Sequence, residues 1–198
     1  MPPPKKAAKK AAGLHDKHHQ ANDLRRAYEH MGRVAVLRQT SQSSTTDDID
    51  ELTTLAQQAI KSGHNKEAAD LLRASEHFSF AALAGVTSGV IHISAELKQS
   101  IAEHFDELKR RGDEHWVEGE ENSNTLARIY QIARNSATEA FKARAYHEAL
   151  EYARAAEALA HVKQHASLKV AEGNKTCRSK ALDSSKVVNN GQHYRSRS

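Results

Sequence analysis

Apolar side chains recur at intervals of three and four residues along most of this chain, which is the period of an amphipathic α-helix. The pattern predicts helices at about residues 16–37, 47–62, 66–84, 90–111, 123–144 and 147–166. The prolines lie at positions 2–4, so none of them interrupts a predicted helix. Many apolar positions hold alanine and few hold aromatic residues, which favours closely packed helices over a β-sheet. The sequence therefore predicts an all-α fold, a helical bundle of about five to six helices.

Glycines and polar clusters mark the breaks between these helices. Gly63 stands where a helix commonly ends with a left-handed residue, and Asn65 is placed to cap the helix that follows. We expect another break at Gly85 and Gly89. An acidic loop is expected over residues 112–124, anchored to the bundle by its tryptophan.

No glycine separates the last two predicted helices, so the directions of their apolar faces must be compared. At about 100° per residue, the apolar face of residues 123–144 points about 150° away from that of residues 147–166. One straight helix could not bury both faces on the same side. We therefore predict a turn near residues 144–146.

An internal repeat supports this turn. A shift of 81 residues aligns residues 60–78 with residues 141–159. The identical pairs are Lys61 and Lys142, Glu67 and Glu148, Ala68 and Ala149, Arg73 and Arg154, Ala74 and Ala155, and Glu76 and Glu157. The chain is thus predicted to contain two related helical hairpins.

A stripe of histidine and arginine follows one side of the helix predicted over residues 147–166. The stripe consists of His147, Arg154, His161 and His165, which fall within about 40° of one another and about 160° from the alanine-rich face. The simplest interpretation is a solvated face. The alternative is an interaction surface, because imidazole and guanidinium groups suit partner and subunit interfaces. His161 and His165 have the spacing of metal ligands but lack the glutamate of HExxH, so we predict no metal site.

Both hairpins resemble the inter-helix turn and second helix of a tetratricopeptide repeat. Gly63, Glu67 and Ala68 match the family pattern in the first copy, and Tyr146, Glu148, Ala149 and Leu150 match it in the second. The resemblance covers less than a quarter of the chain. It implies helical hairpins of the kind that bind other proteins.

The chain is also similar to HEPN domains, which are α-helical bundles of prokaryotic toxin–antitoxin and defence systems. Active members of that family carry an arginine and a histidine with four to six residues between them. Arg154 and His161, with six residues between them, fit this spacing. This resemblance implies a metal-independent ribonuclease at a dimer interface, with Arg154 on the phosphate and His161 as acid and base.

Charge is distributed unevenly along the chain. The basic residues at the two ends are Lys5, Lys6, Lys9, Lys10, Lys175, Arg178, Lys180, Lys186, Arg195 and Arg197. With Asp183 they give the ends +9, which leaves −5 for residues 11–174 of a chain whose net charge is +4. We predict disordered basic tails over residues 1–15 and 171–198 around a helical domain of residues 16–170. Such tails either keep the protein in solution or contact nucleic acid without reading its sequence.

The sequence carries no Gly-rich phosphate loop, nucleophile elbow or CxxC motif, so catalysis is not the expected function. The lone Cys177 excludes an internal disulfide, and no apolar run approaches the length of a membrane span. We therefore predict a cytoplasmic, non-enzymatic module for protein interaction or assembly, without a cofactor. Its partner is expected to be another protein or a second copy in a homodimer. The ribonuclease stays open as the alternative.

Overall fold

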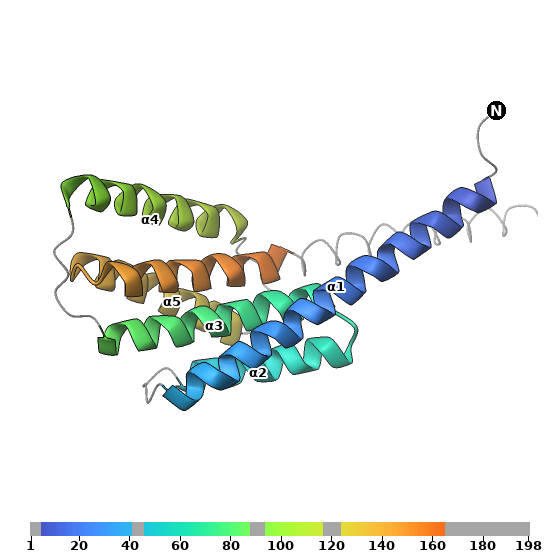
Figure 1. The fold of residues 1–198 in the computed structure, drawn as a ribbon, viewed down its shortest axis with the longest axis horizontal. Helices are drawn as coiled ribbons and strands as arrows, with labels where there is room; N and C mark the ends of the chain where they lie inside the picture. The colour runs from blue at the N-terminus through green and yellow to red at the C-terminus, as the bar shows by residue number, and fades with distance from the viewer. Residues whose placement is uncertain (1–4, 41–45, 88–93, 117–123, 165–198) are drawn as a thin grey trace, which may run out of the picture. The chain divides into compact units, whose positions relative to one another are not determined.

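The computed structural model describes residues 5–40, 46–87, 94–116 and 124–164, with the side chains of residues 5–17, 40, 87 and 124 left outside the description. Every described element is a helix, which confirms the all-α prediction. The helices are α1 (Lys5–Thr40), α2 (Thr46–Lys61), α3 (Asn65–Thr87), α4 (Ala95–His115) and α5 (Asn124–Lys142). A sixth helix, called the last helix below, covers residues 146–164. The helices up to Lys163 belong to one compact unit (Figure 1).

Helix α1 is longer than predicted, because it begins at Lys5 and not near residue 16. Its first residues are mostly alanine and lysine, which are strong helix formers, so the helix continues through a segment that we assigned to the tail. Figure 1 shows this N-terminal part running past the other helices. Residues 1–4 and the predicted C-terminal tail, residues 171–198, lie outside the described residues.

Three predicted boundaries are wrong for reasons of packing. Helix α3 continues through Gly85, where a Cβ atom would stand 3.4 Å from the carboxyl group of Glu148, so the glycine permits a close approach. Asn65 is not the cap but the first residue of α3, and its side-chain amide donates to the backbone oxygen of Gln20 in α1. Helix α4 continues to residue 115, so only the later part of the acidic loop could be a loop, and residues 117–123 lie outside the description.

The predicted anchor at the end of α4 is confirmed. Trp116 follows the helix and stacks on Tyr130 of α5, with ring centroids 3.9 Å apart and planes 2° from parallel. The Tyr130 hydroxyl donates to Asp113, and Arg134 pairs with the same carboxylate at 2.9 Å. Burial is the main reason that the pKa of the Tyr130 phenol lies above its ordinary value. These contacts fix α4 against α5.

The turns of the two hairpins have the same geometry. Gly63 has φ +74° and Arg144 has φ +62°, the left-handed region in both cases. In the first turn Gly63 N donates to Ile60 O and His64 N donates to Ala59 O. The bonds of the second turn are the same ones shifted by 81 residues, from Arg144 N to Phe141 O and from Ala145 N to Ala140 O. This is the Schellman ending of a helix, and it confirms the predicted turn near residues 144–146.

Substitutions at these turns are expected to change stability in opposite directions. Gly63→Ala should lower the free energy of unfolding by about 1 kcal/mol, because an alanine pays the steric cost of positive φ. Arg144→Gly should raise it by up to about 1 kcal/mol, because it removes that cost. Urea denaturation of both variants measures the difference. No space limits the first change, since a Cβ at Gly63 has nothing within 4 Å. Equal effects of the same sign would contradict the left-handed turn.

The repeat extends to units of three helices, α1–α3 and α4 to the last helix. Arg33 of α1 pairs with Glu76 of α3, while Arg111 of α4 pairs with Glu157 of the last helix, and the two glutamates are 81 residues apart. The two central helices, α3 and the last helix, lie side by side and run in opposite directions (Figure 1). They meet where Phe78 packs edge-on against Tyr152. Because these central helices are antiparallel, an approximate two-fold axis relates the two units.

Candidate interaction surface

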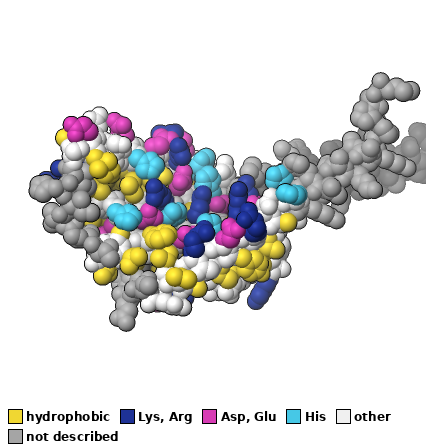
Figure 2. Space-filling view, viewed as in Figure 1, with side chains coloured by type: hydrophobic (Ala, Val, Ile, Leu, Met, Phe, Trp, Pro, Cys, Tyr) yellow, Lys and Arg dark blue, Asp and Glu magenta, His cyan; other side chains and the backbone are white. Residues whose placement is uncertain are grey.

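The two central helices are largely buried, and a strip of polar side chains lies where they meet. We call this strip the seam. It consists of Lys66, Asp70, Arg73 and His77 of α3 and His147, Glu151 and Arg154 of the last helix. Figure 2 shows histidine, basic and acidic side chains mixed across this face of the molecule, with hydrophobic side chains beside them. Within the predicted histidine stripe, Arg154 is therefore partly covered at the seam, while His147 stays exposed.

A buried carboxylate joins the two sides of the seam. Glu151, whose side chain is 6% exposed, lies 2.7 Å from His77 Nδ1 across the helix pair. Arg154, three residues later, donates to its other oxygen at 2.6 Å, and the exposed His147 lies 3.9 Å away. Burial alone would raise the pKa of Glu151. The hydrogen bond from His77 and the positive charges of His77, Arg154 and His147 outweigh burial, so the pKa lies below its ordinary value.

A second carboxylate, that of Glu76, joins α1 to α3 in the same way. Glu76 lies 2.5 Å from His30 Nδ1, and Arg33 Nε donates to it at 2.6 Å. Burial would raise the pKa of Glu76, but the hydrogen bonds from His30 and Arg33 lower it below the ordinary value. The hydrogen bond between Arg33 and Glu76 raises the pKa of Arg33. A histidine–glutamate–arginine group thus fastens α1 to α3, as another fastens α3 to the last helix.

The remaining members of the histidine stripe lie in different surroundings. The His161 ring packs against His115 of α4, with centroids 4.8 Å apart, so α4 covers this end of the stripe. His165 lies outside the described residues. The structure therefore does not present the predicted stripe as one continuous exposed surface. The sequence could not show this, because the helical period of one element does not reveal which neighbour covers it.

The structure gives different partners to the proposed ribonuclease pair. Arg154 is bonded to Glu151, whereas His161 packs on His115. No described hydrogen bond or ion pair joins Arg154 to His161, and two turns of helix separate them along the chain. The ribonuclease reading stays a prediction.

The two basic segments that were predicted to contact a polyanion lie largely outside the described residues. Lys5, Lys6, Lys9 and Lys10 belong to the helical backbone of α1, but their side chains are not described, and the basic residues from Lys175 onward lie outside the described residues. Within the described part of the chain, no group of three or more histidine, cysteine, aspartate and glutamate residues could hold a metal ion.

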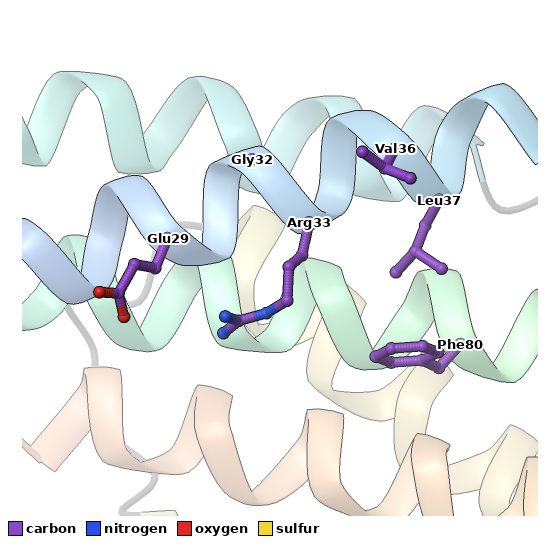
Figure 3. A pocket seen from close by; sticks show the side chains of 6 residues that line it. All are labelled: Glu29, Gly32, Arg33, Val36, Leu37 and Phe80. Atoms are coloured by element: carbon purple, nitrogen blue, oxygen red, sulfur yellow. The ribbon is translucent and has the colours of Figure 1, made fainter.

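An apolar groove runs between α1 and α3 and was not predicted (Figure 3). Its volume is about 370 Å³, and it is lined by Glu29, Gly32, Arg33, Val36, Leu37 and Phe80. Val36 is 62% exposed, and a Cβ at Gly32 would have nothing within 4 Å, so the groove opens outward. The signal in the sequence was the apolar pair at positions 36 and 37, which makes the apolar face of α1 wider than packing on α3 requires.

The fold defines an all-α domain made of two similar three-helix units. No family model, curated protein or solved structure matches this chain. The tetratricopeptide-like and HEPN-like resemblances therefore stay predictions. Among the described helices, none has an apolar stretch long enough to cross a membrane.

Proposed function

We propose that this protein is a non-enzymatic helical interaction module whose partner binds in the groove between α1 and α3. The open apolar groove carries this proposal. Val36 leaves most of its side chain in water, and Leu37 and Phe80 form the floor beside it. Covering apolar side chains of this kind is favourable because it removes their surface from water.

The partner is an amphipathic helix of another protein that places a large apolar side chain in the groove. The wall on α1 runs from Glu29 to Leu37, which is about 12 Å along the helix axis. That length matches two turns of a bound helix, the usual reach of one anchor and its neighbours. Glu29 and Arg33 stand on the rim and are already paired with Arg25 and Glu76, so the apolar floor and not these charges selects the partner.

The basic ends of the chain add a second contact in this proposal. Their +9 charge attracts a polyanion without sequence reading, and the −5 body does not compete for it. The tails would hold the module near nucleic acid, while the groove selects the protein partner.

Photo-crosslinking tests the groove in cells. A benzoylphenylalanine at position 36 is expected to trap a defined partner segment, whereas the same group at the exposed position 142 on α5 is not. A synthetic peptide of the trapped segment should then bind the purified protein, and Val36→Asp should weaken it by about tenfold or more. Ala35→Asp is the matched control, since it adds the same charge one residue away, at an exposed position that does not line the groove.

Two outcomes would overturn the proposal. Equal crosslinking at positions 36 and 142 would show that the groove has no specific occupant. Crosslinks to a second copy of this chain, with a dimer in light scattering that Val36→Asp dissociates, would make the groove a self-association surface and not a site for another protein.

A further inference from the structure

The seam contains an arginine pair that neither the groove nor the tails use. Arg73 and Arg154 are equivalent residues of the two units, 81 positions apart. Each is paired with a carboxylate three residues earlier, Arg73 with Asp70 at 3.6 Å and Arg154 with Glu151 at 2.6 Å. Both side chains are partly exposed at the seam.

The contacts between the central helices place these arginines opposite each other. His77 of α3 contacts Glu151 of the last helix. Because the two helices are antiparallel, moving four residues back along α3 to Arg73 corresponds to moving four residues forward along the last helix to Ala155. That residue is next to Arg154. The two arginine residues therefore lie on either side of the approximate two-fold axis.

Arg73 has hydrogen-bond donors without an acceptor. Its Nε and Nη2 atoms are buried and find no hydrogen-bond partner within the described part of the chain. The Asp70 carboxylate at 3.6 Å is close enough for an ion pair but too far for a good hydrogen bond. Buried N–H groups of a charged side chain are costly when they stay unpaired. An anion bound to these donors would remove that cost.

We propose that the seam binds a phosphate-type oxyanion between Arg73 and Arg154. A tetrahedral anion has oxygens on several sides and can accept from both guanidinium forks, which a planar carboxylate cannot do equally well. The ligand is a small phosphorylated molecule and not a nucleic-acid backbone, because Asp70 and Glu151 interrupt the basic residues of the seam and leave no continuous basic track for an extended polyanion. Lys66, at one end of the seam, supplies a further positive charge.

Calorimetric titration of the full chain with inorganic phosphate and with pyrophosphate tests this site, at pH 7 and with ionic strength held constant by NaCl. Arg73→Gln and Arg154→Gln are each expected to weaken binding by about tenfold or more. Arg128→Gln is the control, because Arg128 is also an ion-paired arginine at the surface but bridges Asp48 and Glu51 away from the seam. The Nε–H resonance of Arg73 should shift on titration in the wild type and in Arg128→Gln.

Several results would overturn the proposal. One is phosphate affinity that is unchanged in Arg73→Gln. Another is an Arg73 Nε–H resonance that phosphate and chloride shift equally. A third is binding of a single-stranded DNA oligonucleotide, but not of phosphate or pyrophosphate, that depends on both arginines. If a glutamine variant does not fold, Arg154→Lys replaces it. This variant keeps the charge but loses the fork, and it should bind phosphate more weakly than the wild type.

Discussion

Replacing Phe78 with alanine is expected to lower the free energy of unfolding by about 3–5 kcal/mol, the usual cost of deleting a fully buried aromatic ring. Phe78 is completely buried, and its ring packs edge-on against Tyr152 with centroids 5.7 Å apart. The substitution would therefore leave a cavity at the contact between the two three-helix units. Urea denaturation followed by circular dichroism at 222 nm measures the loss.

Phe80→Ala is the matched control, since it makes the same chemical change two residues later on the same helix. Phe80 lines the groove and is only partly buried, so its loss is expected to cost about 1 kcal/mol or less. Equal costs for the two variants would contradict the position of the core between the central helices. A loss of partner binding in Phe80→Ala without a loss of stability would agree with the proposed groove.

Glu151→Gln is expected to lower the free energy of unfolding by about 2–3 kcal/mol at pH 7, because a neutral amide cannot replace a buried carboxylate that bonds both His77 and Arg154. His77 and Arg154 would each lose a charge-assisted bond, and the amide would bring a donor where an acceptor is required. Glu139→Gln is the control. Its exposed ion pair with Lys142 should contribute less than about 0.5 kcal/mol.

The effect of Glu151 should depend on pH in a defined direction. The pKa of Glu151 in the folded protein lies below its ordinary value, so the unfolded chain takes up a proton first as the pH falls. The stability that the ionised carboxylate contributes is present above the unfolded pKa, about 4.3, and is lost as the pH falls through the lower folded pKa. The difference between the wild type and Glu151→Gln should therefore shrink between pH 5 and pH 3. A difference that stays constant over this range would show that the charge of Glu151 is not responsible.

The local elements of this protein were determined by its sequence. The spacing of apolar residues was enough to find all six described helices, because the helical period is a property of each segment alone. The direction of the apolar faces placed the turn at Arg144 although no glycine marks it, and the repeat gave the second hairpin. The end of α3 was misplaced, because Gly85 is there for its approach to Glu148, a residue far away in the chain.

Only the tertiary structure decided what each helix face does. The histidine stripe was found from the sequence, but its division into an ion pair at Glu151, a contact with His115 and an exposed His147 depends on where α3 and α4 lie. The groove needs Phe80 of α3 beside Leu37 of α1, and the contact of His77 with Glu151 needs two antiparallel helices in one register. The helical period is a property of one segment and can be recognised in the sequence. A groove or an ion pair between helices forms only when distant segments pack together, so the sequence does not reveal it.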